Sequence, residues 1–268
     1  MWNAITRAVS PSIARCELSH VARVPIDLEL ARIQHGNYLR ALERAGCDVL
    51  VLPAEVELPD SVFVEDVAIV LDELAVLTRP GAMSRRAEVA TVADPLRRYR
   101  PLQAIEAPAT LDGGDVLRIG RTLYVGQSVR SNPDGLGQLR NRLAPFGYVV
   151  EGVPTRDCLH LKSAVTALDD RRLLVNRAWI DPASFDGFTL LDVAPDEPSA
   201  ANVLRLADRL IAARAFPRTA ECLEALGYRV ERVEASELAK AEGAVTCCSL
   251  IVPVLSAAAG PSPHGGMR

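Results

Sequence analysis

The stretch LRALERAGCDVLVLP, residues 39–53, has the pattern of a helix that ends at a glycine and is followed by a short β-rich run. The same form recurs in LRNRLAPFGYVVEGVP (139–154) and ECLEALGYRVERVEA (221–235), and more loosely, without the glycine, in ADPLRRYRPLQAIEAP (93–108). Leu and Ala recur at helical spacing before the stop. A glycine stands where a helix end favours a left-handed residue in the first three stretches, at Gly46, Gly147 and Gly227. The chain is therefore predicted to repeat a helix–strand unit.

Pairs of apolar runs joined by charged turns separate these helical stretches, and they are typical of β-hairpins. The pairs lie at 60–78, 111–126, 159–176 and 199–213, and a last run at 242–255 has the N-terminal run 3–9 as its candidate partner. Five units of about 45 residues fit blades arranged around a centre and closed by pairing the two chain ends. An ordinary α/β sandwich with coincidental spacing is the alternative.

Composition limits the classes of function. Of 268 residues, 49% are hydrophobic and 24% charged, and the formal net charge of −4 argues against a nucleic-acid-binding surface. No apolar run reaches the ~18–20 residues needed to cross a bilayer, and residues 1–20 lack a signal core, so we expect a cytoplasmic protein without membrane contact. We expect one catalytic domain over 1–255 and a disordered tail over 256–268, which is rich in Pro and Gly.

Five chemically distinctive residues occupy equivalent places at the start of the first hairpin strand of each unit. They are separated by 46, 48, 42 and 45 residues, and they are Asp66, Asp112, His160, Asn202 and Cys247. In a radial arrangement, equivalent positions converge on the axis, so these side chains should face one central pocket. A Cys with a His and an Asp from elsewhere in the chain is the general form of an activated nucleophile. A structural role for a buried His remains the alternative.

Three carboxylates stand close together in the run LPDSVFVED (58–66). If this run is an unbent strand, Asp60 and Asp66 share a face and Glu65 points the other way. Burying negative charges in such a segment is unfavourable unless other groups compensate them. Surface salt bridges, a metal held by oxygens and a cationic substrate would each supply this compensation. The planar, five-donor guanidinium is the cation that carboxylates bind best.

Two arginines follow the second hairpin strand of their units, again in equivalent positions. Arg85 lies in RPGAMSRRAE (79–88) and Arg130 in GQSVRSN (126–132). Paired hydrogen bonds from such arginines could hold a substrate carboxylate. Carboxylates at one end of the pocket and arginines at the other indicate a zwitterionic amino acid that bears a guanidine.

The motifs LPDSVFVEDVA, TRPGAMSRR, LDGGDV, LHLKS, SAAN and GAVTCCS resemble, in order and over roughly residues 1–255, the dimethylarginine dimethylaminohydrolases of the guanidine-modifying superfamily. The resemblance implies an α/β fold, a five-bladed α/β propeller of ββαβ units with pseudo-five-fold symmetry. It implies a hydrolase of amidine C–N bonds that converts Nω-methylated arginine, dimethylated asymmetrically or monomethylated, to citrulline and a methylamine. The reaction would pass through a covalent Cys thiouronium, without cofactor or metal.

The resemblance also implies residue roles. Cys247 matches the nucleophile, His160 the proton donor and acceptor, and Asp112 its orienting acid. The positions that match substrate-binding residues are Asp66 with Glu65 for the guanidinium, Arg85 and Arg130 for the carboxylate, Asp60 for the α-amine, Phe63, and the main chain at Leu18, on a lid, and at Ala241. Glu242 stands where the family is expected to have Asp.

Other activities share this chemistry. A hydrolase of Nω-hydroxyarginine would use the same clamp, that is, the arginines and carboxylates that hold the amino acid. Arginine deiminases and amidinotransferases act on related substrates but are generally longer than this chain. A non-catalytic propeller that binds a partner is the alternative from another class. The expected partner is a small zwitterionic guanidino amino acid, and the chain is expected to be a monomer or a homodimer.

The adjacent cysteines of EGAVTCCS (242–249) allow a disulfide, a metal site, buried filler or a nucleophile. The six cysteines show no zinc spacing, and a disulfide between neighbours would be strained and unusual in a reducing compartment. Neighbours on a strand face opposite ways, so one thiol should face the pocket and the other pack behind it. The choice of Cys247 over Cys248 rests on the resemblance.

Overall fold

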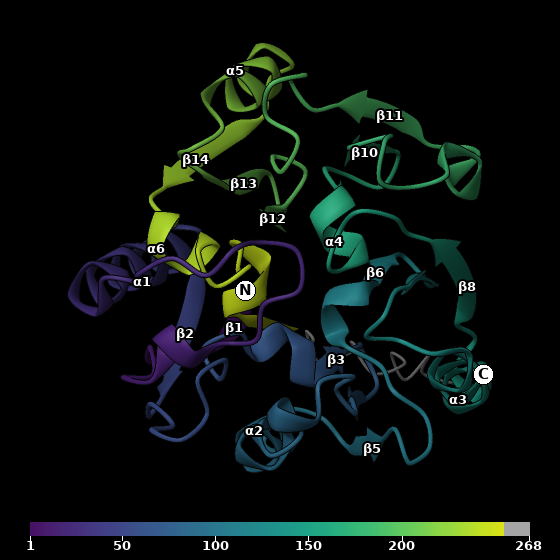
Figure 1. The fold of residues 1–268 in the computed structure, drawn as a ribbon. Helices are drawn as coiled ribbons and strands as arrows, with labels where there is room; N and C mark the ends of the chain where they lie inside the picture. The colour runs from purple at the N-terminus through teal and green to yellow at the C-terminus, as the bar shows by residue number, and fades with distance from the viewer. Residues whose placement is uncertain (255–268) are drawn as a thin grey trace, which may run out of the picture.

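Each predicted hairpin forms the inner part of a three-stranded sheet. The computed structural model describes residues 1–254, and its five sheets surround a common centre (Figure 1). In every sheet two antiparallel strands are joined by a third strand that runs parallel to the middle one. The chain is thus a five-bladed α/β propeller of ββαβ units, and the sandwich alternative is wrong. The tail expected over 256–268 lies outside the described residues.

The strands follow the predicted repeat closely. Sheet by sheet they are β15 (Leu250–Pro253), β1 (Trp2–Arg7) and β2 (Cys47–Leu52); β3 (Ala68–Val70), β4 (Ala75–Leu77) and β5 (Leu102–Ala104); β6 (Val116–Ile119), β7 (Thr122–Gln127) and β8 (Val149–Pro154); β9 (Val165–Ala167), β10 (Arg172–Val175) and β11 (Thr189–Asp192); β12 (Val203–Leu206), β13 (Arg209–Ala213) and β14 (Arg229–Val233).

Helices connect the middle strand of four sheets to the outer strand. They are α1 (Leu28–Arg44), α2 (Glu88–Arg97), α3 (Pro133–Leu143) and α5 (Pro217–Ala225). Asp27 caps α1 by accepting from the Leu30 N–H, and Asn132 caps α3 in the same way. The predicted stops at Gly46, Gly147 and Gly227 have φ of +89°, +73° and +91°. The fourth sheet has only the single turn η6 (Pro182–Phe185) in this place, which agrees with the missing helical pattern there.

The two chain ends close the ring. β1 pairs antiparallel with β15, with Trp2 opposite Pro253 and Ile5 opposite Leu250, so the predicted partnership of 3–9 with 242–255 is confirmed. β1 also pairs parallel with β2 on its other side. Side chains from the sheets and helices fill five hydrophobic clusters, one of which contains Ile5 and Leu250. Closure therefore builds one blade from both ends of the chain and joins it to the other four.

Short helical turns, not strands, carry the distinctive residues into the centre. These turns are η2 (Val64–Val67), η4 (Gly113–Asp115), α4 (Leu161–Ala164) and η7 (Thr246–Cys248), and each precedes the first strand of its blade. Other single turns are η1 (Ile13–Arg15), η3 (Met83–Arg85), η5 (Ala144–Phe146) and α6 (Ser236–Ala239). We refer to the four that precede a first strand as the entry turns.

The entry turns overturn two arguments from strand alternation. Asp66 lies inside η2, so the prediction that Asp60 and Asp66 share one strand face is wrong. Cys247 and Cys248 both lie in η7, where successive residues are about 120° apart rather than on opposite faces. Cys248 is nonetheless buried in the core, while Cys247 is partly exposed.

Within residues 1–254, none of the helices combines the length and the apolar character that a bilayer crossing needs.

The closure predicts where the fold is most sensitive. Ile5 is fully buried at the β1–β15 junction, so Ile5→Ala should lower the free energy of unfolding by about 2–5 kcal/mol in denaturant titrations. Val51→Ala on the neighbouring β2, where Val51 is 44% exposed, should cost less than about 1 kcal/mol. Equal losses in the two variants would contradict the role of the junction.

Candidate active site

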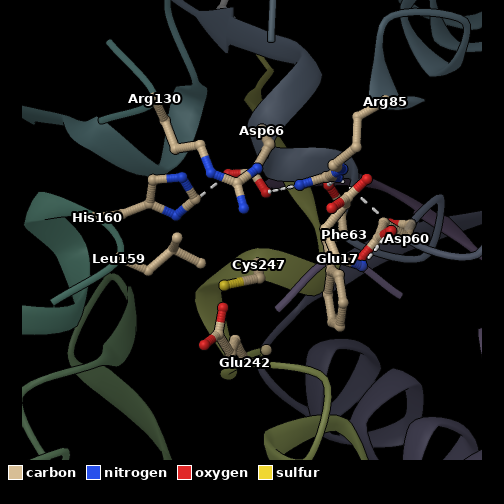
Figure 2. A pocket seen from close by; sticks show the side chains of 11 residues that line it. Glu17, Asp60, Phe63, Asp66, Arg85, Arg130, Leu159, His160, Glu242 and Cys247 are labelled. Atoms are coloured by element: carbon tan, nitrogen blue, oxygen red, sulfur yellow. Dashed lines mark hydrogen bonds and ion pairs between the residues drawn. The ribbon is translucent and has the colours of Figure 1, made fainter. Parts of the chain in front are cut away.

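A small pocket lies where the entry turns meet, at the centre of the ring (Figures 1 and 2). Seven residues predicted from the sequence line it: Asp60, Phe63, Asp66, Arg85, Arg130, His160 and Cys247. Four further lining residues were not predicted: Glu17, Leu159, Glu242 and Gly243. Five predicted residues are not among those that line it in the described chain: Leu18, Glu65, Asp112, Asn202 and Ala241. The cavity measures about 20 Å³, room for about one water molecule.

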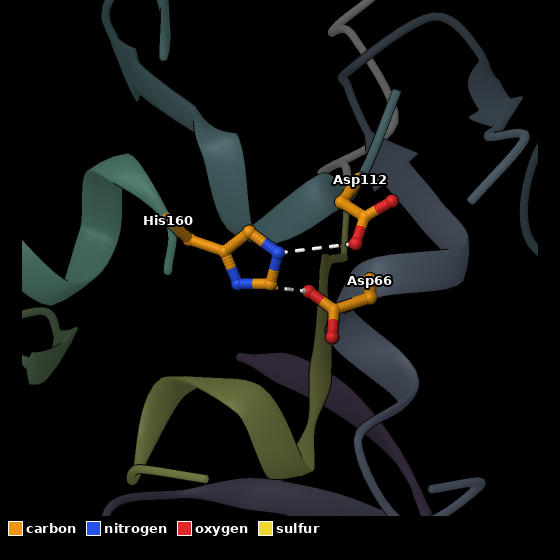
Figure 3. A group of neighbouring side chains, drawn as sticks. All are labelled: Asp66, Asp112 and His160. Carbon is orange, nitrogen blue, oxygen red and sulfur yellow. Dashed lines mark hydrogen bonds and ion pairs between the residues drawn. The ribbon is translucent and has the colours of Figure 1, made fainter. Parts of the chain in front are cut away.

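The imidazole of His160 lies between two carboxylates (Figure 3). Its Nε2 is 3.0 Å from Asp112 Oδ2, and its Nδ1 is 3.8 Å from Asp66 Oδ1. Gly114 makes this approach possible, because a Cβ there would lie 2.6 Å from both Asp66 Oδ1 and His160 Nδ1. Asp115 accepts from the N–H of Leu161 at 2.9 Å and so fixes the residue after His160. The orienting contact expected between Asp112 and His160 is present.

The charges of this group shift its titration. Burial alone would lower the pKa of His160, but Asp66, Asp112 and Asp115 outweigh it and raise the pKa to about 9. Burial would raise the pKa of Asp66, but His160 and Arg85 hold it at about 2. Burial raises the pKa of the Cys247 thiol to about 12, with Glu65 and Asp66 adding to the effect. These pKa values place a neutral thiol and a charged imidazole in the lining of the same pocket at pH 7.

The same cluster is the place where a metal ion could be held. Among the described residues, one group has potential metal-ligand atoms that all lie within 4.8 Å of one another. It consists of Asp66, Asp112 and His160 (Figure 3). The guanidinium of Arg85 already contacts Asp66 at 2.5 Å, and the N–H of Gly81 donates to Asp112 at 2.8 Å. A fixed cation in contact with Asp66 repels a second one. We interpret the cluster as an ion-pair network.

The two arginines are placed differently from each other. Arg85 is buried and pairs with Asp66 at 2.5 Å and Glu88 at 2.8 Å, so the prediction that arginines and carboxylates lie at opposite ends of the pocket is wrong for this pair. A short helical turn, η3, brings Arg85 back to η2, which pattern alone could not reveal. Arg130 donates from Nη2 to Ser19 Oγ at 3.0 Å.

Glu65 belongs to a separate network outside the pocket lining. Its carboxylate is 2.5 Å from Lys162 Nζ and accepts from Thr246 Oγ1 at 2.7 Å. Asn202 donates to the same Thr246 hydroxyl at 2.9 Å and accepts from the Thr246 N–H at 3.0 Å. Glu65 is thus neutralised by a lysine inside the protein. This network fixes the residue next to Cys247.

Two of the missed residues carried a usable signal. Leu159 directly precedes His160, and Gly243 opens the cysteine motif; a Cβ at Gly243 would lie 2.1 Å from the Phe63 ring, so only glycine fits. Glu17 lies in a segment without periodicity or motif, and Glu242, which opens EGAVTCCS, was noted only as a departure from the family's expected Asp. Their places could be known only from contacts between distant parts of the chain.

Comparisons with known proteins agree with this geometry. The family described as N,N dimethylarginine dimethylhydrolase, eukaryotic, matches residues 20–166. The N(G),N(G)-dimethylarginine dimethylaminohydrolase of Streptomyces coelicolor is 42% identical over 92% of this chain and 95% of its own length. This chain belongs to the dimethylarginine dimethylaminohydrolase family. The Pseudomonas aeruginosa enzyme of the same name is 36% identical over 84% of this chain and 89% of its own.

A solved structure gives the same result for the fold. A cysteine-to-serine mutant of the P. aeruginosa dimethylarginine dimethylaminohydrolase, complexed with citrulline, superposes with a TM-score of 0.89 at 34% identity. The match covers 94% of this chain and 99% of that one. The five-bladed arrangement is therefore that of the family.

Residues 17–26, which we call the lid, are held closed by the site itself. The Glu242 carboxylate accepts the backbone N–H of Ser19 at 2.9 and 3.0 Å, that of Val21 at 2.8 Å and that of His20. The Glu17 N–H donates to Asp60 at 3.1 Å. Glu242 has φ of +57°, a conformation that costs a non-glycine residue about 1 kcal/mol or more. The cavity of about 20 Å³ behind these contacts is smaller than an arginine.

The lid contacts predict a role for Glu242. Glu242→Ala removes an acceptor shared by three N–H groups, so kcat/KM for methylarginine should fall about tenfold, which corresponds to about 1.4 kcal/mol. Hydrogen exchange of residues 19–21 should speed up in parallel. Glu242→Gln keeps one acceptor oxygen, so its kcat/KM and its exchange rates should lie between those of the parent chain and of Glu242→Ala. Glu57→Ala removes an exposed carboxylate elsewhere and should change neither quantity. Unchanged hydrogen exchange of residues 19–21 in Glu242→Ala would show that Glu242 does not hold the lid.

The pKa of His160 predicts a pH dependence of stability. Because the folded imidazole titrates at about 9 and an ordinary one at 6.5, the folded state holds the proton more tightly. This stabilisation is complete below pH 6.5 and is lost as pH rises through 9, with a maximum on the order of 3 kcal/mol. Denaturant unfolding at pH 6, 7.5 and 9 should show the decline in the parent chain and a flatter profile in His160→Gln. Parallel profiles would show that His160 is not the group responsible.

Proposed function

We propose that this chain hydrolyses Nω-methylated arginine to citrulline and a methylamine through a covalent adduct on Cys247. The observation that carries the proposal is the pairing of His160 with Asp112 at 3.0 Å in the pocket that Cys247 lines. Membership of the dimethylarginine dimethylaminohydrolase family supports the same reaction. A protein that only binds a partner would not need a thiol, an imidazole and an orienting carboxylate together.

The substrate supplies part of the activation. The pKa of the Cys247 thiol is about 12 because burial and the carboxylates of Glu65 and Asp66 disfavour the thiolate. A guanidinium in the pocket brings a positive charge to the sulfur and reverses that balance. The thiol proton leaves to solvent, and attack of the resulting Cys247 thiolate on the guanidinium carbon forms a C–S bond and a tetrahedral adduct.

His160 then moves the protons. With a pKa of about 9 it is charged at neutral pH and can protonate the departing amine as the C–N bond breaks. The S-alkylthiouronium that remains is attacked by water, whose proton returns to the now neutral His160. The C–S bond then breaks as the hydroxyl proton of this second adduct passes to the sulfur, which releases citrulline and the thiol. Asp112 holds the imidazole in place through both steps.

The groups proposed for the substrate's polar ends are engaged while the lid is closed. Asp60, proposed for the α-amine, accepts from the Glu17 N–H, and Arg130, proposed for the carboxylate, donates to Ser19. Asp66, which is proposed to bind the substrate's guanidinium, forms an ion pair with Arg85. Substrate would therefore exchange places with internal partners as the lid opens. Main-chain oxygens at Leu18 and Ala241, and the neighbouring Glu65, remain proposed as additional substrate contacts.

Several expectations remain part of the proposal. We propose one catalytic domain over residues 1–255, a cytoplasmic location, and a monomer or homodimer that acts on a small zwitterionic amino acid. Nω-hydroxyarginine would fit the same clamp, and a panel of arginine, its methylated forms and hydroxyarginine would rank them by citrulline release. A preference for unsubstituted arginine would overturn the assignment of substrate while leaving the mechanism.

The cysteine pair offers a matched test of the nucleophile. Cys247→Ser and His160→Ala should reduce citrulline release from methylarginine to below a few per cent, because each removes a reacting group. Cys248→Ser changes the adjacent, buried thiol, whose Sγ contacts Ala244 O at 3.6 Å, and should keep most activity. Circular dichroism would check that all three are folded. Activity lost in Cys248→Ser but kept in Cys247→Ser would reverse the assignment.

A further inference from the structure

A second cavity of about 310 Å³ adjoins the reaction pocket. The two share three lining residues, Leu159, Glu242 and Gly243. Drug-sized ligand sites begin at about 300 Å³, and an apolar cavity of about 150 Å³ is already enough for benzene. The proposed mechanism uses none of this space.

The three shared residues, which we call the shared wall, place the cavity next to the part of the reaction pocket where the substrate's guanidinium would react. Leu159 precedes His160, and Gly243 lies four residues before Cys247. Asp60, proposed for the α-amine, lines the reaction pocket but not the cavity. Figure 2 shows Leu159 and Asp60 on opposite sides of Cys247. A group carried on the ω-nitrogen would therefore be directed at this wall.

Backbone and partly buried side chains form the boundary between the two spaces. Gly243 contributes only backbone, and the side chains of Leu159 and Glu242 are each half-buried. His20 and Val21 of the lid line the cavity as well, so the closed lid forms one of its walls. A substituent could thus be enclosed together with the reacting guanidinium.

The lining selects the chemistry of the occupant. Trp179, Phe216 and several alanines give it apolar surface, and the acidic residues Asp157 and Glu242 also line it. Among the described residues that line it there is no lysine or arginine. Such a cavity favours an alkyl or aryl group, neutral or positively charged, over an anionic one.

We propose that this cavity is a side pocket for the ω-substituent, so that the enzyme takes arginines whose ω-nitrogen carries an alkyl or arylalkyl group larger than methyl. This inference rests on the proposed function. The reaction balances as before: the Cys247 sulfur bonds to the guanidinium carbon, the C–N bond to the larger amine breaks, and His160 protonates that amine. Water then releases citrulline, so no further reactant is needed.

A substrate series tests the pocket directly. Nω-methyl-, Nω-butyl- and Nω-benzylarginine would be compared by release of citrulline and of the amine. We expect kcat/KM for the butyl and benzyl compounds to lie within about tenfold of that for methyl. Between Nω-(3-aminopropyl)- and Nω-(2-carboxyethyl)arginine, the amine should be favoured at least about tenfold, which is about 1.4 kcal/mol. Equal rates for this charged pair would contradict the role given to Asp157 and Glu242.

A pair of alanine substitutions locates the effect. Ala239 is the last residue of α6 and lines the cavity, while Ala225 is the last residue of α5 and does not; both are exposed. Ala239→Phe should lower the benzyl-to-methyl ratio of kcat/KM at least about tenfold by filling the space. Ala225→Phe should leave the ratio unchanged. The same fall in both variants, or in neither, would overturn the proposal.

The outcomes separate the two proposals. If methylarginine is hydrolysed but the butyl and benzyl compounds neither react nor inhibit competitively, the side pocket is wrong and the proposed function stands. If none of the arginines, methylarginine included, is hydrolysed or alters the trapping of Cys247 by a guanidine-like electrophile, the proposed function is wrong and the side pocket falls with it.

Discussion

The burial of Asp66, Asp112 and Asp115 around one imidazole is the constraint on which the centre of this propeller depends. Carboxylates removed from water are tolerated only when cations and N–H groups compensate them. Here the protonated His160 is one cation and Arg85 another, while Gly81, Gly114 and Leu161 donate backbone N–H groups. The compensation requires the entry turns of three blades to meet within hydrogen-bonding distance. The arrangement that holds the blades together at the centre is therefore the same one that sets the protonation state of the site.

The closed lid can be understood from the same balance of charge. Without a zwitterionic ligand, Asp60, Asp66 and Arg130 would face a small polar pocket with unmet hydrogen-bonding capacity. The lid and Arg85 supply those partners from within the protein. Under the proposed function, a substrate that carries an amine, a carboxylate and a guanidinium would take the place of these internal partners. Binding would then be an exchange of partners.

Much of the fold could be read from the sequence, because local rules act there. Gly46, Gly147 and Gly227 marked helix ends, the charged turns marked hairpins, and the repeat brought Asp66, Asp112, His160 and Cys247 to one centre. The errors arose where contacts are not local. The assumption that successive residues face opposite sides of a strand gave wrong predictions at the entry turns, because a three-residue helical turn has no sequence period. The pairing of Glu65 with Lys162, and of Glu242 with the lid amides 221–223 residues away, depends on packing that no pattern records.

Pseudo-symmetry explains why one fold can hold such an asymmetric site. Equivalent positions in five blades point at the same axis, so each blade can contribute a different group without altering the backbone: a carboxylate from two, and an imidazole, an amide and a thiol from the others. In the proposed mechanism the bond-making steps use only Cys247, His160 and Asp112, whatever group the leaving amine carries. Discrimination between amines must come from the walls beyond the axis. In this chain that wall is Leu159, Glu242 and Gly243, contributed by segments next to the proton carrier and the nucleophile. Selectivity for the leaving group can therefore change by substitutions at the rim of the blades, with the charge balance at the centre left intact.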